Sequence, residues 1–540
     1  MRSFALTVLA VASSALAQIN VPGQVPLNPV EPLQHRLAYA GATGMTVSWN
    51  TYEQISEPTV YYGTNSWNLT SFATGTSVTY ASSLTWSNHV KITGLTPDTL
   101  YYYIVSHTNC YNCSELAPYT FTTSRETGDY TPFTVAVAVD LGVMGATGLS
   151  DTSAGAITVN DSTTIQSLAR YVEGFDFLWH PGDIAYADYW LKEQIHKYLP
   201  WVSVDQGYKV YNMLLNTFYD EMQPITALKP YMVGPGNHEA NCDNAGTTDS
   251  ATNISYTVDI CIEGQRNFTG FRNHFRMPSA ESGGVENFWY SFDHGMVHFV
   301  QISTETDLGH GLVGPDEPFG VEGNFDSVGQ DAGPFGTKNE QYNWLQQDLA
   351  SVDRTKTPWI VVAGHRPFYA ANPEGGVCLE CITAFEPLFL QYNVDLVLAG
   401  HVHFYERNAP IRNGTADPNE LNNPSSPWYI LNGAAGHYDG LDPIEGSPDY
   451  SRYVQNSTYG WSKLTFHNCT HLTHDFVASG NGTVLDTATL YKNHTCAAPA
   501  SNVTGTNSSA PSSDHSGSAS LKASSVLFAV VLATVLMVAL

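Results

Sequence analysis

The stretch that decides the fold is Phe175-Asp176-Phe177-Leu178-Trp179-His180-Pro181-Gly182-Asp183-Ile184-Ala185-Tyr186. Its first half is a short, mostly apolar run, which is typical of a strand buried on both faces of a parallel sheet. Its second half places a histidine, an aspartate and a tyrosine directly after that strand. In α/β proteins, ligands bind at the carboxyl ends of such strands. The stretch therefore predicts both a buried strand and a functional site at its end.

Five other apolar runs lie on either side of this stretch, at Phe133–Val139, Tyr231–Val233, His298–Ile302, Trp359–Ala363 and Val394–Ala399. Between them, two groups of apolar residues recur at helical spacing: Ile165, Leu168 and Val172 behind Asp161, and Leu345, Leu349 and Val352 behind a Thr337-x-x-Glu340 capping box. Strands that alternate with helices predict a layered α/β domain.

Four of the five runs also end in polar residues, namely Asp140-Leu141-Gly142, Gly236-Asn237-His238-Glu239, Gly364-His365 and Gly400-His401-Val402-His403. Loops at the carboxyl ends of strands converge, so we expect these side chains to meet. Carboxylate, imidazole and amide donors suit cations of intermediate hardness, and one carboxylate can bridge two of them. The sequence therefore predicts a two-metal site, and two ions about 3.5–4 Å apart can polarise a phosphoryl oxygen and generate hydroxide.

The five blocks resemble the pattern DxG, GDxxY, GNH(D/E), VxxH and GHxH of the purple acid phosphatases, a family of the calcineurin-like metallophosphoesterase superfamily. The resemblance covers Asp140 to His403, with Val362-Ala363-Gly364-His365 as the fourth block. It implies an iron(III) ion bound by Asp140, Tyr186, His403 and a shared Asp183. It implies a divalent ion (iron, zinc or manganese) bound by Asp183, Asn237, His365 and His401. The implied reaction is hydrolysis of phosphate monoesters at acid pH by metal-activated hydroxide, without a covalent phosphoenzyme.

Gly142 and Tyr186 are the decisive detail within these blocks. In other members of the superfamily that the blocks resemble, the first block reads D-x-H and supplies an imidazole. This chain has glycine at that position and a tyrosine three residues after Asp183. A phenol has a pKa of about 10 and needs a strongly acidic cation, such as trivalent iron, to lose its proton in acid. Tyr186 therefore predicts an iron-containing, coloured protein.

His238 follows a predicted ligand directly, and the resemblance implies that it contacts phosphate and helps to transfer a proton. The resemblance to plant-type members implies paired histidines nine and ten residues after the fourth-block histidine. This chain has Glu374 and Gly375 at those positions. The donor of a proton to the leaving group therefore stays open among His180, His310 and His437. Arg366 and Tyr369 are either substrate contacts or loop packing.

The chain carries 22 Lys+Arg against 50 Asp+Glu, which gives a formal net charge of −28. Such a balance argues against nucleic acid or an anionic membrane surface as a partner. We expect small phosphorylated substrates, with phytate among the candidates. A phosphodiesterase or nucleotide pyrophosphatase on the same fold is the alternative, and an inactive surface binding protein is a more distant one. Oligomeric state is left open.

Residues 34–123 differ from the rest because short alternating runs rich in Tyr, Thr, Val and Ser, such as Met45–Trp49, are separated by turn residues. The segment Gly94–Tyr103 resembles the tyrosine corner of fibronectin type III modules, and we expect Trp49 in the core.

The predicted fold class is an α/β (α+β layered) metallophosphoesterase sandwich with an N-terminal all-β, fibronectin type III-like domain. The predicted segments are a signal peptide at 1–17, the β-sandwich at 31–128, the dinuclear metallophosphatase domain at 129–424, its C-terminal β-rich part at 425–496, a Ser/Thr-rich stalk at 497–525 and a hydrophobic GPI-type signal at 526–540. Within the phosphatase domain, Asp307–Gly336 has no periodicity and predicts a long surface loop.

The two ends of the chain indicate export to the cell surface or cell wall. A charged start, an apolar stretch and Ala15-Leu16-Ala17 predict a cleaved signal peptide. Fifteen apolar residues end the chain, fewer than the ~20 that span a bilayer, so we expect a GPI anchor attached near Ser516, with a short transmembrane anchor as the alternative.

Export also explains the cysteines and the glycosylation sequons. Eight cysteines in an oxidising compartment predict disulfides between sequence neighbours, at 110–113, 242–261, 378–381 and 469–496, with a zinc ribbon as the alternative for the two CxxC pairs. Predicted N-glycosylation sites are Asn68, Asn112, Asn160, Asn253, Asn267, Asn413, Asn456, Asn468, Asn481, Asn493, Asn502 and Asn507.

Overall fold

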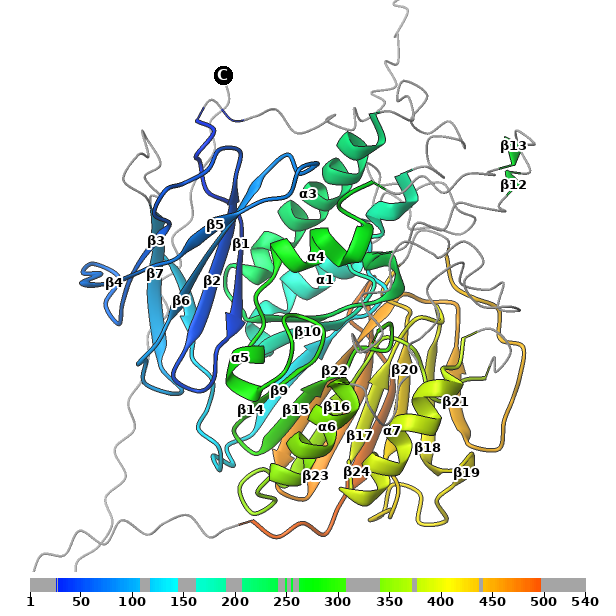
Figure 1. Cartoon of the computed structure of the whole chain (residues 1–540). Helices are drawn as coiled ribbons and strands as arrows, with labels where there is room; N and C mark the ends of the chain where they lie inside the picture. Colours follow the sequence, from blue (N-terminus) through cyan, green and yellow to red (C-terminus); the bar gives the residue numbers. More distant parts are fainter. Residues whose placement is uncertain are drawn as a thin grey trace, which may run out of the picture. The chain divides into compact units, whose positions relative to one another are not determined.

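The structure, a computed structural model, describes residues 26, 28–106, 117–143, 162–190, 206–240, 248–249, 254–255, 262–306, 340–371, 376–436 and 440–496 (Figure 1). Predictions for the signal peptide, the 307–336 segment, the stalk and the C-terminal signal lie outside these residues. No helix within the described ranges is long and apolar enough to cross a membrane.

The N-terminal part is a sandwich of two four-stranded sheets. One sheet has the order β1 (Leu33–Tyr39), β2 (Met45–Thr51), β6 (Trp86–Ile92), β5 (Thr76–Val78), and the other β4 (Ser71–Thr74), β3 (Thr59–Gly63), β7 (Leu100–Ser106), β8 (Tyr119–Thr122). Trp49 is fully buried between them, and the backbone N–H of Thr96 donates to Oη of Tyr101 at 3.0 Å. This bond is the defining contact of a tyrosine corner, so the predicted all-β fold and its core tryptophan are confirmed.

Two larger sheets follow. The first has the order β11 (Tyr231–Gly234), β10 (Phe177–Pro181), β9 (Phe133–Val137), β22 (Gly460–Asn468), β23 (His471–Ala478), β24 (Val484–Tyr491). The second has the order β14 (Tyr290–His294), β15 (Val297–Gln301), β16 (Trp359–Ala363), β17 (Leu396–Ala399), β20 (Trp428–Asn432), β18 (Tyr405–Arg412), β19 (Thr415–Ala416), with β21 (Ser451–Gln455) paired to β18. Strands β9 to β11 are mutually parallel, as are β15, β16, β17 and β20.

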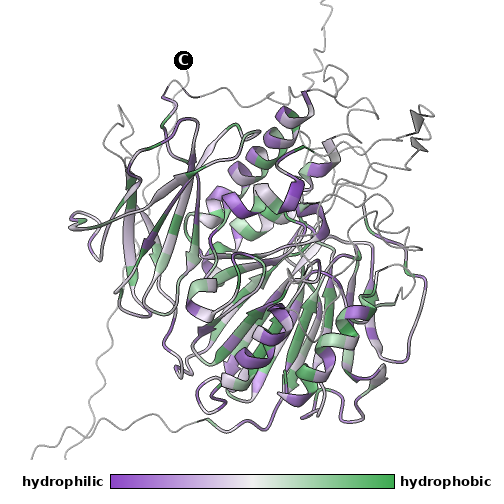
Figure 2. Ribbon diagram, viewed as in Figure 1, coloured by the Kyte–Doolittle hydropathy of each residue, from purple (hydrophilic) through white to green (hydrophobic). Residues whose placement is uncertain are grey.

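The two sheets pack face to face through aromatic rings, with Phe299 of β15 5.2 Å from Phe177 and 5.5 Å from Trp179 of β10. Helices cover the outer faces, and their apolar stripes join one core cluster with the strands. They are α1 (Thr164–Arg170), α3 (Gly207–Thr226), α6 (Glu340–Ser351) and α7 (Leu379–Gln391). Figure 1 shows α6 and α7 lying over the β15–β17 sheet, and Figure 2 shows apolar residues concentrated on its strands. The predicted α/β sandwich is confirmed.

Shorter elements complete the described chain: α4 (Thr269–His274), α5 (Ser279–Ser282), the two-residue strands β12 (Thr248–Asp249) and β13 (Ile254–Ser255), and the 3-10 turns η2 (Val172–Gly174), η3 (Ala187–Tyr189), η5 (Asn237–Glu239) and η6 (Arg266–Phe268).

Four local predictions need correction or stay untested. Helix α1 is capped by Thr163, whose side chain accepts from the backbone N–H of Gln166, so the predicted start behind Asp161 was wrong by two residues. Val172 lies in η2, beyond the end of α1. Strand β9 ends at Val137 rather than Val139. Thr337 lies outside the described residues, so the capping box of α6 stays a prediction.

Two of the four predicted disulfides are formed, Cys378–Cys381 and Cys469–Cys496. The other two predicted pairs lie outside the described residues. Six of the seven described sequon asparagines are exposed, and Asn456 is half-buried. Such surfaces suit glycosylation, which stays a prediction, as do the domain boundaries.

Candidate active site

The two predicted metal-binding aspartates lie in the loops that follow neighbouring parallel strands. Asp140 follows β9 and Asp183 follows β10, and both are buried. Both adopt left-handed backbone conformations, with φ of 60° and 52°. A non-glycine residue held this way costs of order 1–3 kcal/mol, and such strain concentrates at functional sites.

One group of donor atoms surrounds the phenol of Tyr186. Its Oη lies 3.0 Å from Oδ1 of Asp140, 3.2 Å from Oδ2 of Asp183 and 3.1 Å from Nε2 of His403. Nε2 of His403 in turn lies 3.7 Å from Oδ1 of Asp140. The four residues predicted to bind iron(III) therefore present one donor atom each to a common point.

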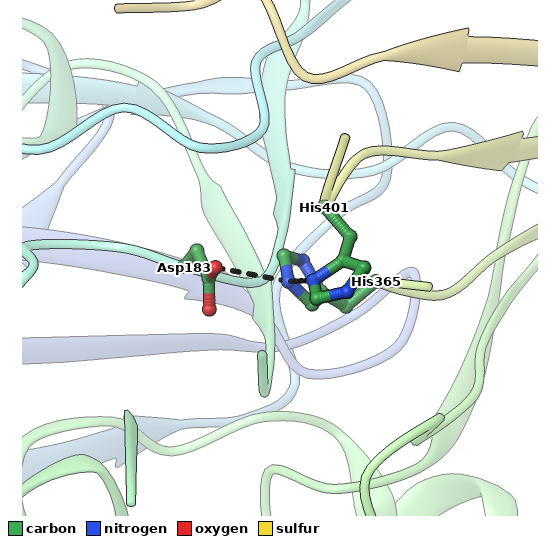
Figure 3. Close-up of side chains that lie close together, drawn as sticks. All are labelled: Asp183, His365 and His401. Carbon is green, nitrogen blue, oxygen red and sulfur yellow. Dashed lines mark hydrogen bonds and ion pairs between the residues drawn. The ribbon is translucent and has the colours of Figure 1, made fainter. Parts of the chain in front are cut away.

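The second group gathers around Asn237 and Asp183. Oδ1 of Asn237 lies 3.0 Å from Nε2 of His365 and 3.0 Å from Nδ1 of His401. Nε2 of His365 lies 3.0 Å from Oδ2 of Asp183 and 3.3 Å from Nδ1 of His401. Figure 3 shows the two imidazoles and the Asp183 carboxylate pointing toward one another.

These spacings fit two ions that share one ligand. Donor atoms that are each about 2.1 Å from one ion lie about 3.0–3.4 Å from one another. All the donor pairs given above have this spacing except Nε2 of His403 and Oδ1 of Asp140, which are 3.7 Å apart. Oδ2 of Asp183 belongs to both groups, as a bridging carboxylate would. One donor atom from each of Asp183, His365 and His401 lies within 4.8 Å of the other two. The structure thus brings all seven predicted ligands together, and their binding of metal stays a prediction.

The electrostatics of the site also fit a bound cation. Burial and the neighbouring Asp183 raise the pKa of Asp140 well above its usual range. Burial acts on Asp183 in the same direction, but the imidazoles of His365 and His238 outweigh it and hold the pKa of Asp183 well below its usual range. Burial, Arg366 and His365 lower the pKa of His401, which favours the neutral imidazole that a metal needs. Two neighbouring buried carboxylates can both be ionised only when a positive charge lies close to them, and a bound cation would supply that charge.

Two glycines of the motifs make room for these side chains. A Cβ at Gly142, where φ is +67°, would lie 3.2 Å from Cδ2 of Tyr186. A Cβ at Gly236 would lie 2.2 Å from Oδ1 of Asp183. Glycine at the first block therefore creates the space that the Tyr186 ring occupies.

His238 lies at the edge of the site and is held by Asp188, a residue outside the predicted motifs. Nδ1 of His238 lies 2.6 Å from Oδ2 of Asp188, whereas its Nε2 lies 3.8 Å from Oδ2 of Asp183. The Nε2 side of the ring therefore faces the metal-binding groups. The available signal was the aspartate two residues after Tyr186, in Tyr186-Ala187-Asp188.

Glu239, which belongs to a predicted motif but had no predicted role, connects the loops beneath the ligands. Its carboxylate accepts three backbone N–H groups, from Asp183 at 2.9 Å, Ile184 at 2.9 Å and Gly236 at 2.7 Å. Burial and Asp183 raise the pKa of Glu239 to about 8. Asp442 acts similarly on the last block, because its Oδ2 accepts the backbone N–H of His403 at 2.7 Å.

The remaining candidates are mostly placed in structural roles. His180 is buried, lies 2.7 Å from Oη of Tyr231, and has its pKa lowered to about 3 by burial, so it does not suit a proton donor. Tyr369 donates to Glu386 at 2.9 Å. Nε of Arg366 pairs with the Glu305 carboxylate at 3.0 Å. His310, Glu374, Gly375 and His437 lie outside the described residues.

Three family descriptions match the chain. Residues 32–123 match "Purple acid Phosphatase, N-terminal domain", residues 149–405 match "Calcineurin-like phosphoesterase", and residues 426–487 match "Iron/zinc purple acid phosphatase-like protein C". Together they cover the β-sandwich, most of the ligand blocks and the C-terminal strands.

The chain is 40% identical to acid phosphatase A of Cryphonectria parasitica, over 91% of this chain and 97% of the relative, and 34% identical to an acid phosphatase of Aspergillus ficuum, over 83% and 85%. It is 29% identical to purple acid phosphatase 18 of Arabidopsis thaliana, over 82% and 79%. Its fold is similar to that of purple acid phosphatase PPD1 from yellow lupin (Lupinus luteus) seeds, with a TM-score of 0.63, 23% identity and coverage of 86% of this chain and 75% of that one. The chain therefore belongs to the purple acid phosphatases, metal-dependent acid phosphatases with a calcineurin-like phosphoesterase domain.

Proposed function

We propose that this acid phosphatase hydrolyses phosphate monoesters at acid pH, with iron(III) at the Tyr186 group and a divalent iron, zinc or manganese ion at the Asn237 group. The single observation that carries the proposal is the position of Tyr186 Oη, 3.0–3.2 Å from three other donor atoms. A phenol in that position favours a trivalent ion over a divalent one, because only a strong Lewis acid keeps it deprotonated in acid.

Each residue has a defined part in this proposal. Two bound ions would supply Lewis acidity and lower the pKa of water, so that a nucleophile forms in acid. Asp183 fixes the spacing between the two donor groups. His238, held at Nδ1 by Asp188, presents Nε2 to an oxygen of the phosphate group and can hold or deliver a proton there. Small phosphorylated compounds, phytate among them, are the proposed substrates.

We also propose that the protein is exported, glycosylated and held at the cell surface by a GPI anchor. The exposed sequon asparagines and the Cys378–Cys381 and Cys469–Cys496 disulfides support export, because disulfides persist in oxidising compartments. Release of the protein from cells by phospholipase C tests the anchor. Retention on the membrane with the hydrophobic tail still present by mass spectrometry would refute it.

The visible absorption spectrum and metal content of the purified protein test the metal assignment. We expect a phenolate-to-iron(III) band, roughly at 500–600 nm, that is lost in Tyr186→Phe. Tyr103→Phe is the matched control, because the Tyr103 hydroxyl donates to Ala227 between the sandwich and α3, away from the donor groups. A colourless, active wild-type protein with two divalent ions would remove the role given to Tyr186.

A paired substrate assay tests the reaction class. We expect faster hydrolysis of p-nitrophenyl phosphate than of bis(p-nitrophenyl) phosphate at pH values near 5, where the proposed nucleophile can form. Faster hydrolysis of the diester would favour a phosphodiesterase instead.

A further inference from the structure

Helix α4 separates two cavities of different character. Its Phe271, together with Phe275 just after it, lines a cavity shared with Tyr186, His238 and Glu239 of the active site. Arg272, together with Arg276, lines an open cavity of about 460 Å³ with Ser279, the carboxylate of Glu286 and other mostly polar residues. The second cavity contains none of the predicted metal ligands.

The two arginines of this cavity differ in how their charge is balanced. Arg272 forms a two-pronged ion pair with Glu286, with Nε to Oε2 at 2.6 Å and Nη2 to Oε1 at 2.7 Å. Nη1 of Arg276 instead donates to two neutral backbone carbonyls, those of Arg272 at 2.7 Å and Phe275 at 2.6 Å. Among the described residues, no carboxylate lies within ion-pair distance of Arg276.

A second unbalanced guanidinium lies nearby, which makes the region positive. Arg36 of β1 is buried and donates to the carbonyls of His274 and Gln34 and to Oδ1 of Asn50, all neutral acceptors. Burial lowers the pKa of Arg36 to about 9, with a further contribution from Arg276. Burial and the same two arginines hold the pKa of His89 and His274 well below the usual value.

This concentration of positive charge is unusual in a chain with a net charge of −28. Arg276 is half-buried, and Glu286 on the same wall already pairs with Arg272, so the wall keeps a net positive charge that an anion in the cavity would balance. Arginine is suited to tetrahedral oxyanions because its planar fork donates two parallel hydrogen bonds. Nε and Nη2 of Arg276 make no hydrogen bond to the described residues, and the hydroxyl of Ser279 is a further donor on the cavity wall.

We propose that the cavity lined by Arg272, Arg276 and Ser279 is a second anion-binding site, separate from the metal centre, that takes inorganic phosphate. Inorganic phosphate is the product of the phosphatase reaction, so the site would be occupied as product accumulates. Because α4 and the residue after it also line the active-site cavity through Phe271 and Phe275, a bound anion would stiffen that wall.

Equilibrium dialysis of the metal-loaded wild-type protein with radiolabelled inorganic phosphate tests the proposal. We expect two phosphates per chain, one at the metal centre and one in the cavity. Arg276→Gln should bind one, with kcat/KM for p-nitrophenyl phosphate within about twofold of wild type. Arg452→Gln is the matched control, because Arg452 is a surface arginine paired with Glu420, and it should bind two.

A second variant tests the proposal without depending on the folding of Arg276→Gln. Ser279 is the first residue of α5, where an acidic residue favours the helix N-terminus, so Ser279→Asp should fold while placing a negative charge on the cavity wall. It too should bind one phosphate. Binding of a single phosphate by the wild-type protein, or of two by either cavity variant, would overturn the proposal.

Discussion

Nδ1 of His238 lies 2.6 Å from Oδ2 of Asp188, and both side chains are at least nine-tenths buried. The carboxylate fixes the ring orientation and leaves Nε2 on the side of the metal-binding groups. Removing such a supporting partner typically costs about 10–100-fold in activity. We therefore expect Asp188→Asn to lower kcat/KM for a phosphate monoester by that factor, measured in the metal-loaded protein.

A double-mutant cycle separates positioning from general destabilisation. If Asp188 acts only through His238, adding Asp188→Asn to His238→Ala should change kcat/KM little further. Equal losses from Asp188→Asn in both backgrounds would show that Asp188 acts on something other than His238.

Gly142 offers a test of the space that Tyr186 needs. Its φ is +67° and a Cβ there would lie 3.2 Å from the Tyr186 ring, whereas Gly94 has a similar φ of +74° and nothing within 4 Å of its Cβ. Alanine at either position should cost about 1 kcal/mol of stability through backbone strain. Only Gly142→Ala should also displace the phenol and shift or weaken the visible band, as measured on protein of known iron content. An unchanged band in Gly142→Ala would show that the ring tolerates the methyl group.

Much of the fold was predictable because the buried strands are short apolar runs bounded by polar motifs. Trp359–Ala363 was predicted to the residue as β16. The start of α1 was missed because Asp161 and Thr163 are both good N-caps, and the choice between them depends on the residue three positions later. Gln166 forms a capping box with Thr163, a signal that was present in the sequence.

The supporting residues of the site were harder to predict. Glu239 lies inside a recognised motif, but its bonds reach backbone groups more than fifty residues earlier, at Asp183 and Ile184. Asp442 supports His403 from a segment with no motif of its own. Motif spacing identifies residues that present donor atoms at strand ends, whereas these contacts exist only once separate loops have packed together.

Metal removal should expose the repulsion between Asp140 and Asp183. Burial and Asp183 raise the pKa of Asp140 in the folded protein. The protonated carboxyl group is therefore compatible with the metal-free fold at low pH, and stability is lost as pH rises above about 4, the pKa of an aspartate in the unfolded chain. We expect chelation to lower Tm at pH 7, as measured by differential scanning fluorimetry. Asp140→Asn should then raise Tm of the metal-free protein but lower that of the metal-loaded protein. A lower Tm in both states would show that the carboxylate stabilises the fold without metal.

His298 should stabilise the protein most at the acid pH where it is proposed to work. Nδ1 of His298 lies 2.7 Å from Oδ1 of Asp293, and its Nε2 lies 2.9 Å from Oδ2 of Asp348. Burial alone would lower its pKa from 6.5, but the two carboxylates outweigh burial and raise it to about 9. A raised pKa means that the stabilisation is complete below about pH 6.5 and is lost as pH rises through about 9.

That shift corresponds to about 3 kcal/mol, at 1.36 kcal/mol for each pKa unit. We expect urea unfolding to show wild type more stable than His298→Gln by roughly this amount at pH 5.5, and the gap to close by about pH 10. His467→Gln, which changes an exposed histidine bonded to Thr473, is the control and should show little difference at any pH. A gap between wild type and His298→Gln that stays constant from pH 5.5 to 10 would mean that His298 stabilises by packing and not by its charge.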